Sequence, residues 1–388
     1  MAEAVIVDAV RTPIGKRNGS LADIHPADLS ANVLRVLAAR TGIDPAIVDD
    51  IVWGCVSQVG DQSAQIGRYV VLAAGWPETV PGTTVSRACG SSQQALDFAA
   101  AMVMSGQCDM VVAGGVESMS RVPLGAGREL GRPFGLRARE RYAVPLAQHG
   151  FPNGDFNQGI GAELIAQEWG LTRQDLDGFS AESHALAAAA VDAGAFRDQV
   201  AHLDDAPTFV DDEGIRRGTT VETLAGLKPS FREDGIVHAG NSSQISDGAG
   251  AMFVTTPQRA RELGLKPIAR YVGGSVIGSD PIKMLDGPIA ATEKVLRRTG
   301  LSIGDIGTFE VNEAFASVPL AWIKATGADR ALVNPQGGAI AVGHPLGGSG
   351  AILMTKMIHR MRQQGIRYGL QTMCEGGGTA NATIVELL

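Results

Sequence analysis

The chain has 388 residues, of which 45% are hydrophobic and 19% are charged. A length of this order predicts two or three domains at about 150 residues each, and the composition excludes a disordered chain, a collagen-like repeat and a small disulfide-stabilised fold. The formal net charge is −8 and no block of five basic residues occurs, so nucleic acid is not an expected partner.

The cysteines, Cys55, Cys89, Cys108 and Cys374, form no C-x-x-C pair and have no zinc-ligand spacing to histidines, so no metal site is expected. The opening residues, MAEAVIVDAVRTPIGK, lack the basic flank and apolar core of a signal peptide. No apolar run reaches the ~18 residues that a membrane span needs. We therefore expect no membrane partner and a cytoplasmic location, where free thiols stay reduced.

Short apolar runs alternate with helical patterns in the first part of the chain. The expected strands are residues 4–7, 51–56, 83–85 and 110–113, and the expected helices are residues 26–40 and 93–104. This alternation favours an α/β fold with a mainly parallel sheet that helices cover on both faces.

Residues 118–245 have a different character, because a glycine-, arginine- and proline-rich stretch (121–141) precedes two helical stretches at 160–169 and 175–193. We expect an insertion with a small fold of its own. It would divide a first half made of residues 1–117 and about 246–265, in which 249–255 is one more strand.

Residues 266–388 repeat the pattern of the first half. The expected strands are residues 267–276, 308–311, 370–374 and 382–387, and the expected helices are residues 290–299, 314–326 and 349–362. The repetition suggests an internal duplication.

Four short strings place a reactive or polar side chain among small residues that expose backbone N–H groups. They are SRACGSS around Cys89, NEAFA from Asn312, GGAIAVGHPLGGSG around His344 and MCEGGG around Cys374. P-loop, H-E-x-x-H and G-x-S-x-G motifs are absent, which counts against the usual nucleotide, metalloprotease and serine-hydrolase sites.

Cys89 follows an expected strand and precedes an expected helix, so its thiol faces the positive end of a helix dipole. This position is expected to lower the thiol pKa and to favour the thiolate. A buried, inert cysteine is the alternative, because free cysteine is among the most buried residue types.

Each of the other strings also has a functional and a purely structural interpretation. His344 in its glycine-rich loop can take a thiol proton or donate to an oxyanion, or it is a histidine bonded to a carbonyl. Cys374 runs into glycines 376–378, whose N–H groups can face an anion or form a bulge without a ligand. Asn312 has an N-cap position that needs no chemistry. Only the combination points to a site.

Together these strings resemble those of the thiolases, the acetyl-CoA C-acyltransferase family, in the same order and across nearly the whole chain. The resemblance implies two similar βαβαβαββ halves, each with a five-stranded sheet, and a loop domain inserted in the first. It also implies thiolytic cleavage of 3-ketoacyl-CoA by coenzyme A to acetyl-CoA or propionyl-CoA and a shortened acyl-CoA, which reverses as a Claisen condensation.

The resemblance assigns roles to the motif residues. Cys89 resembles the nucleophile that carries the acyl group as a thioester. His344 resembles the group that activates this thiol and, with a water held by Asn312, stabilises the thioester oxyanion. Cys374 resembles the general acid and base. The backbone N–H groups of Cys89 and Gly376 would form a second oxyanion hole.

Coenzyme A is implied as a co-substrate that lies across the insertion, with no permanently bound cofactor. The positions that match the family's coenzyme A site are Arg216, Thr223, Phe231, Ala239, Ser243, Ala314 and Phe315.

Gln158 departs from the family pattern, because many members have at this position a methionine that floors a short acyl pocket. The departure puts acetoacetyl-CoA specificity in doubt and favours a longer or bulkier acyl chain, in the β-oxidation of fatty acids or the degradation of sterol side chains. A biosynthetic acetoacetyl-CoA thiolase and a non-catalytic acyl-CoA-binding protein remain alternatives. A decarboxylating ketoacyl synthase lacks a second active cysteine, so Cys374 argues against it.

The resemblance also implies a homodimer or a homotetramer that forms through the sheets. The stretch 121–141 is a candidate tetramer contact, and a solvated loop is the alternative.

Overall fold

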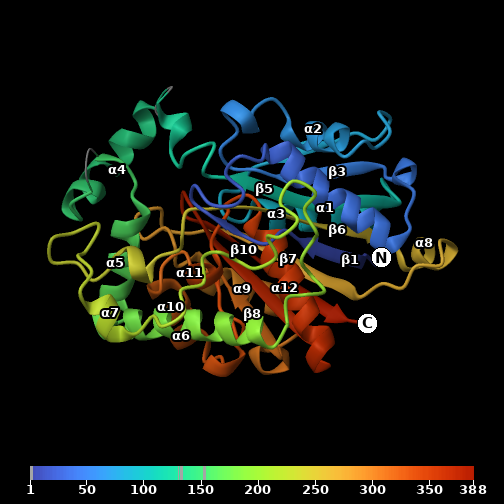
Figure 1. Cartoon of the computed structure of the whole chain (residues 1–388). Coiled ribbons are helices and arrows are strands. Elements are labelled where there is room, and N and C mark those ends of the chain that lie inside the picture. The colour runs from blue at the N-terminus through green and yellow to red at the C-terminus, as the bar shows by residue number, and fades with distance from the viewer. Residues whose placement is uncertain (1–2, 130, 132–133, 152–153) are drawn as a thin grey trace.

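Strands and helices alternate along the chain (Figure 1) in a computed structural model, which describes residues 3–388 apart from 130, 132–133 and 152–153. The strands are β1 (Val5–Arg11), β2 (Gly15–Lys16), β3 (Asp50–Gly54), β4 (Thr83–Val85), β5 (Met110–Ser118), β6 (Ser246–Thr255), β7 (Ala269–Gly278), β8 (Thr308–Val311), β9 (Tyr368–Glu375) and β10 (Thr379–Leu387). The helices are α1 (Pro26–Thr41), α2 (Ile66–Ala73), α3 (Ser91–Ser105), α4 (Leu136–Gln148), α5 (Gln158–Glu168), α6 (Arg173–Asp192), α7 (Val221–Ala225), α8 (Pro257–Glu262), α9 (Gly287–Thr299), α10 (Ser317–Thr326), α11 (Ala339–Val342) and α12 (Ser349–Gln364).

Within the described residues, ten strands form one hydrogen-bonded sheet in the order β4-β3-β5-β6-β1-β7-β10-β9-β8, and β2 pairs with β6. The order contains two similar runs. In the first run, β4, β3 and β5 are parallel, and β6 and β1 follow antiparallel. In the second run, β8 and β9 are parallel, and β10 and β7 follow antiparallel. Val333 bridges Phe309 of β8 at the place that β4 has in the first run, so the two runs have the same plan.

The sheet is mixed, and the expectation of a mainly parallel sheet is wrong. Both β1 and β10 pair antiparallel with each of their neighbours. Continuous apolar runs indicate burial on both faces, but they do not reveal strand direction. The second run also has four strands and a bridge in place of the five strands that the resemblance implied.

In the part of the chain that the structure describes, strands of the two runs pair with each other only where β1 meets β7, at Val5↔Arg270 and Ile6↔Ala269. Helices α3 and α12 contact each other and contact strands of both runs. Alanines on α3 and methionines on α12 fill the space between them. Small side chains on one helix and flexible ones on the other allow this close packing.

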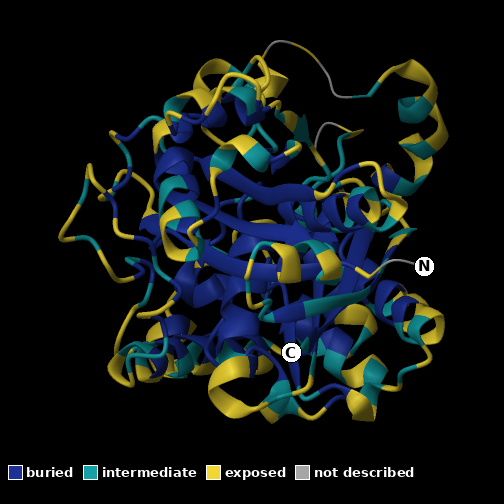
Figure 2. Ribbon diagram, turned by 90° about the vertical axis from the view of Figure 1, so that its right-hand side faces the viewer, coloured by how far each residue is buried: buried dark blue, intermediate teal, exposed yellow. Residues whose placement is uncertain are grey.

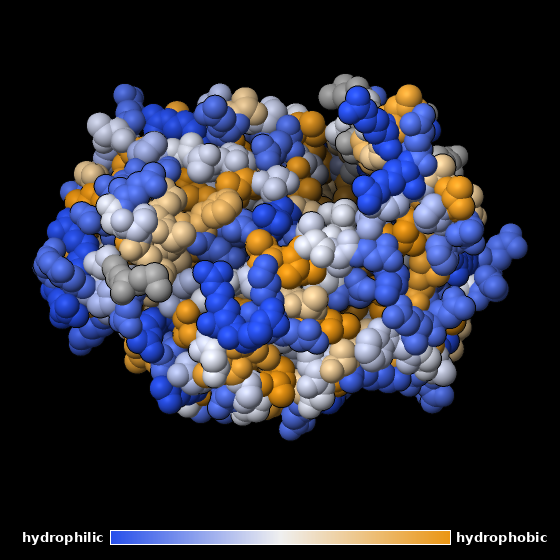
Figure 3. Space-filling model, turned by 180° about the vertical axis from the view of Figure 1, so that it is seen from behind, coloured by the Kyte–Doolittle hydropathy of each residue, from blue (hydrophilic) through white to orange (hydrophobic). Residues whose placement is uncertain are grey.

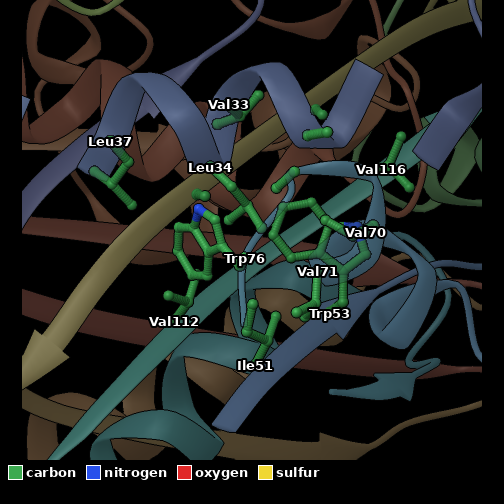
Figure 4. Close-up of a cluster of buried hydrophobic side chains, with 14 of the residues drawn as sticks. Val33, Leu34, Leu37, Ile51, Trp53, Val70, Val71, Trp76, Val112 and Val116 are labelled. Carbon is green, nitrogen blue, oxygen red and sulfur yellow. The ribbon is translucent and has the colours of Figure 1, made fainter. Parts of the chain in front are cut away.

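Other helices cover the outer faces of the sheet. Figure 4 shows Leu34 of α1, Val70 of α2 and Trp76 packed over Trp53 and Val112 of the strands. Helices α9 and α10 cover the second run in the same way. The layers therefore follow in the order α1 and α2, the first run, α3 and α12, the second run, and α9 and α10. Figure 2 shows most of the strands buried and the outer helices partly exposed, and β7 is only partly buried.

The segment between β5 and β6 carries α4, α5, α6 and α7, which lie at the end of the molecule away from both termini (Figure 1). Helices α5 and α6 contact α10. The same segment also reaches the first run, where Asp212 forms a buried ion pair with Arg11 at 2.7 Å. The insertion is thus docked on both halves, and the boundaries 118–245 stay a prediction.

Among the described residues there is no helix with the length and apolar character of a membrane span. The same part of the chain holds no group of three histidine, cysteine or acidic side chains placed to bind a metal.

Candidate active site

The first turns of α3 and α12 touch each other. The hydroxyl of Ser92 accepts a hydrogen bond from the backbone N–H of Ala351 at 2.9 Å. A Cβ atom at Gly350 would lie 2.3 Å from the backbone nitrogen of Gln93, so only glycine fits there. Cys89 directly precedes α3 and His344 shortly precedes α12, so this contact brings their two turns together at the positive ends of two helix dipoles.

Cys89 lies in a tight turn between β4 and α3. Ala88 has a left-handed backbone with φ 42°, which the hydrogen bond from the Ser91 hydroxyl to the Ala88 carbonyl (2.5 Å) supports. The Cys89 side chain is buried, and it packs against Leu353 and Met373, with Leu346 beside them.

The expectation of a resting thiolate at Cys89 is wrong. Burial raises the pKa of the Cys89 thiol well above its usual range, and a negative charge on Cys374, Glu375 or Glu117, whenever one of them is ionised, raises it further. Removal from water disfavours the charged form more than one helix end favours it. Cys89 therefore rests as a thiol and needs a base.

The hydrogen bonds of His344 identify its basic nitrogen. Nδ1 lies 2.7 Å from the Ser349 hydroxyl, and that hydroxyl donates to the Pro345 carbonyl at 2.8 Å. A hydroxyl has one proton to donate, so Nδ1 carries the ring proton and Nε2 is the free base. Burial lowers the pKa of His344 to about 4, which keeps the ring neutral and able to accept a proton at neutral pH.

Asn312 joins His344 to the second cysteine. Its Nδ2 lies 3.5 Å from Nε2 of His344 and 3.8 Å from Sγ of Cys374. The parallel pairing of β8 with β9 places Asn312 and Cys374 side by side at the ends of neighbouring strands.

The expected N-cap position of Asn312 is wrong. The next helix begins only at Ser317, so Asn312 is not an N-cap. Its Oδ1 has no hydrogen-bond partner among the described residues.

Cys374 is fully buried at the end of β9. Burial raises the pKa of its thiol to about 12, although the Asn312 amide and backbone N–H groups act in the opposite direction. A thiol that holds its proton at neutral pH and accepts a hydrogen bond from Asn312 is suited to give a proton and to take it back.

Gly376 and Gln158 lie next to each other, beside the turn that carries Cys89. A Cβ atom at Gly376 would lie 2.9 Å from Nε2 of Gln158 and 3.9 Å from Cβ of Ala88. Gln158 is the first residue of α5, and Asn157 caps this helix. The structure thus brings the Cys89 turn, the β9–β10 turn and the Gln158 amide together, with His344 and Asn312 beside them.

Most of the positions predicted to bind coenzyme A also gather. The Phe231 and Phe315 rings are 5.8 Å apart, edge to face. The backbone N–H of Ser243 donates to the Ala314 carbonyl at 2.9 Å, and Ala239 belongs to the short helix that precedes Ser243. Residues 314–316 thus form backbone hydrogen bonds with the insertion in place of a helical turn. For this reason α10 starts at Ser317, later than the expected residue 314.

Arg216 and Thr223 are exposed and lie further along the insertion. Arg216 lines a surface cavity of about 240 Å³ with His184, Arg217 and Thr219 beside α6. The Thr223 hydroxyl donates to the Thr220 carbonyl, as part of the cap of α7.

Three residues that position the site escaped the sequence analysis. Ser349 orients His344. Glu117 accepts a hydrogen bond from the backbone N–H of Gly347, and Glu313 accepts one from Ile340, so both hold the loop that carries His344. An acidic residue at the end of a strand could have indicated the role of Glu117 and of Glu313. Their hydrogen-bond partners, however, lie more than twenty residues away along the chain, so the sequence does not show which loop they hold.

Comparison with known proteins agrees with this geometry. Residues 4–258 match the family described as thiolase, N-terminal domain, and residues 265–387 match thiolase, C-terminal domain. The steroid 3-ketoacyl-CoA thiolase FadA6 of Mycobacterium tuberculosis is 48% identical over 100% of this chain and 95% of the relative. The 3-ketoacyl-CoA thiolase FadA of Escherichia coli is 43% identical over 100% of both chains.

A solved structure is similar over the same length. The crystal structure of the Bacillus anthracis acetyl-CoA acetyltransferase has a TM-score of 0.90 and 37% sequence identity, and the match covers 100% of this chain and 99% of that one. The chain therefore belongs to the thiolase family of acyltransferases.

Proposed function

We propose that this chain is a degradative thiolase that cleaves 3-ketoacyl-CoA with coenzyme A, releasing acetyl-CoA or propionyl-CoA and a shortened acyl-CoA. The observation that carries the proposal is the meeting of Cys89, Asn312, His344 and Cys374, which come from four separate segments of the chain. The names of the two relatives, both 3-ketoacyl-CoA thiolases, support this direction.

In the first half-reaction, Nε2 of His344 takes the Cys89 proton while Sγ of Cys89 attacks C3 of the substrate. The C2–C3 bond breaks, and its electron pair passes to C2. Cys374 protonates C2, so acetyl-CoA leaves. Cys89 then carries the shortened acyl group as a thioester, and Cys374 is a thiolate.

In the second half-reaction, the Cys374 thiolate takes the proton of the coenzyme A thiol, and the coenzyme A sulfur attacks the thioester. Cys89 leaves as a thiolate and regains its proton from the His344 imidazolium. Both cysteines and the histidine return to their starting states, and no resident cofactor takes part.

Two oxyanion sites accompany these steps. Protonated His344 and a water bound by Asn312 would face the thioester oxygen of the leaving acetyl-CoA. The backbone N–H groups of Cys89 and Gly376 would face the acyl-enzyme carbonyl. The unpaired Oδ1 of buried Asn312 supports the first of these, since it offers an acceptor for such a water.

Coenzyme A would enter between the insertion and the second half. Phe231, Phe315 and Ala314 offer an apolar wall for the pantetheine arm, and Ser243 and Ala239 lie next to it. Exposed Arg216 and Thr223 would lie along the outer part of coenzyme A, where a cation suits its phosphates.

A biosynthetic acetoacetyl-CoA thiolase is the second candidate. The similarity to the Bacillus anthracis acetyl-CoA acetyltransferase favours it. The Gln158 amide beside Gly376 favours the degradative reading, because a polar side chain replaces the apolar floor that a short acyl group would contact.

A homo-oligomer that forms through the first half is part of the proposal. β4 lies at the edge of the sheet. Next to it, Phe98 and Met102 line a surface cavity of about 450 Å³, and Phe98 and Leu72 are exposed. The face seen from behind carries apolar groups among hydrophilic ones (Figure 3). An apolar patch beside an open strand edge is suited to a second copy of the chain.

A cytoplasmic location is also proposed. All four cysteines are free and buried. The mechanism needs two of them as thiols, which a reducing compartment preserves.

The first test is Cys89→Ser. The wild-type protein should remove the enolate absorbance of a 3-ketoacyl-CoA when coenzyme A is added, whereas Cys89→Ser should lose nearly all of this activity because a hydroxyl is a far weaker nucleophile. Cys108→Ser, a buried cysteine outside the site, is the matched control and should keep the wild-type rate. Turnover by Cys89→Ser at the wild-type rate would refute the acyl-enzyme.

A second prediction concerns the orientation of His344. Ser349→Ala removes the acceptor for the Nδ1 proton, so kcat should fall about tenfold, the value of one hydrogen bond of ~1.4 kcal/mol. KM should change little, because Ser349 lies behind the imidazole. Ser349→Thr keeps the hydroxyl and should restore most of the rate. Equal loss in both variants would mean that only packing matters at this position.

A third prediction concerns the acyl chain. The wild type should have a higher kcat/KM for longer 3-ketoacyl-CoA than for acetoacetyl-CoA. Gln158→Met should move that ratio toward acetoacetyl-CoA by about tenfold, the usual effect of small changes in an acyl pocket. Gln167→Met, exposed on the same helix, is the control. A wild-type enzyme that is fastest on acetoacetyl-CoA would favour the biosynthetic candidate.

The fourth prediction tests the assembly by light scattering after size-exclusion chromatography. Phe98→Asp places a charge beside β4 and should convert a dimer to a monomer, or a tetramer to a smaller species. Leu136→Asp, on exposed α4, should leave a dimer intact and would split a tetramer only if α4 forms that contact. A monomeric wild-type protein would contradict the proposal.

A further inference from the structure

Two buried glutamates occupy equivalent places in the two runs of the sheet. Glu117 lies near the end of β5, and Glu375 ends β9. Each strand has a parallel neighbour on one side and an antiparallel neighbour on the other. Each glutamate lies against a glycine that precedes the central helix of the opposite half. A Cβ atom at Gly347 would lie 2.8 Å from Glu117, and one at Gly90 would lie 2.1 Å from Glu375.

The surroundings of Glu117 suit a carboxylate. Its two oxygens accept four hydrogen bonds, from the backbone N–H groups of Val56, Ser57 and Gly347 and from the Gln62 amide, at 2.8–3.0 Å. Four donors satisfy a buried negative charge without a cation.

The surroundings of Glu375 do not suit a carboxylate. Oε2 accepts a hydrogen bond from the Thr379 hydroxyl at 2.6 Å, and Arg87 is 4.0 Å away. Oε1 is buried and has no hydrogen-bond partner among the described residues. Oδ1 of Asn381 is also buried and unpaired. The Asn381 amide cannot turn to help without losing the hydrogen bond from its Nδ2 to the Gly90 carbonyl, at 3.1 Å.

The two unpaired oxygens face the same point. Oε1 of Glu375 lies 2.1 Å from the position of a Cβ atom at Gly90, and Nδ2 and Oδ1 of Asn381 lie 2.9 and 3.0 Å from it. Nδ2 already donates to the Gly90 carbonyl, so it leaves the two oxygens without a donor. Two buried acceptors without a donor are unfavourable unless one of them carries a proton. A carboxylic acid at Glu375 would have a hydrogen to donate to Asn381, and one proton would satisfy both oxygens.

We propose that Glu375 works as a neutral carboxylic acid that donates a hydrogen bond to Asn381, and so holds the nucleophile turn at Gly90 against the β9–β10 hairpin without placing a negative charge beside the two thiols. Glu375 is a positioning residue in this proposal, which rests on the proposed role of Cys89 as nucleophile.

The charged and titratable groups around Glu375 agree with a neutral acid near neutral pH. They are Arg87 and Cys89 from the nucleophile turn, Asp97 from α3 and Cys374 from its own strand. Burial raises the pKa of Glu375 to about 7, and the charge of Asp97 acts in the same direction, against Thr379 and Arg87.

The proton on Glu375 has a consequence for Cys89. As pH rises through the pKa of Glu375, the new carboxylate disfavours the thiolate at Cys89, whose pKa it raises. In a Glu375→Gln variant the amide still donates to Asn381, but no charge appears at any pH. The variant and the wild type should therefore differ only above neutral pH.

The experiment measures alkylation of Cys89 by iodoacetamide, which reacts with the thiolate, across pH. The wild type and Glu375→Gln should react at similar rates at about pH 6, and the variant should react about tenfold faster at about pH 8, as expected if the carboxylate shifts the thiol by about one pKa unit. A rate ratio that does not change with pH would refute the proposal. Glu117→Gln, the equivalent position, is the control: it should lower stability without producing this pH-dependent ratio.

A second measurement does not depend on the reactivity of Cys89. Burial also raises the pKa of Asp97 and of Glu310 to about 7, so the band of Glu375 is identified by subtracting the infrared spectrum of Glu375→Gln from that of the wild type. The difference spectrum should contain the carbonyl stretch of a buried carboxylic acid that disappears as pH rises through about 7. Absence of this band from the difference spectrum would refute the neutral acid. If Cys89→Ser keeps its turnover while the band is present, the proposed function fails and the state of Glu375 stands.

Discussion

The contact between the first turns of α3 and α12 is the constraint on which the site depends. Ser92, Gln93, Gly350 and Ala351 form it, and a side chain at Gly350 would push the two helices apart. The turn that carries Cys89 and the loop that carries His344 lead into these helices. The β8 and β9 ends that carry Asn312 and Cys374 lie on the strands that pack against α12. Small residues at one helix crossing thus bring together four segments that are far apart in the sequence.

Burial of this crossing decides the chemistry of the site. Removal from water keeps both cysteines protonated and His344 neutral at neutral pH. In the mechanism that we propose, every reacting group therefore rests uncharged, and charge develops only when Cys89 passes its proton to Nε2 of His344. The same reasoning separates the two glutamates: Glu117 has four donors for a negative charge, and Glu375 has an unpaired oxygen that needs a proton.

The sequence predicts the strands and helices well because burial leaves a clear apolar pattern, as in β8 and α12. Strand direction left no such pattern, so the mixed sheet was missed. The motif strings identified Cys89, His344, Cys374 and Asn312, but not the charge state of Cys89, which depends on side chains such as Leu353 and Met373 that arrive from the other half. Glu117 and Glu375 escaped for the same reason, since their partners Gly347 and Gly90 belong to the opposite half. Ser349 escaped because only the folded loop shows that its hydroxyl faces the His344 ring.

The central claim is that the thiols at 89 and 374 face one pocket. A trivalent arsenical tests it directly, because tight binding requires two thiols within reach of one arsenic atom. The wild-type protein should bind one equivalent tightly, and Cys89→Ser and Cys374→Ser should each lose that binding, whereas Cys55→Ser and Cys108→Ser should keep it. Tight binding that survives removal of either Cys89 or Cys374 would show that the two sulfur atoms do not meet.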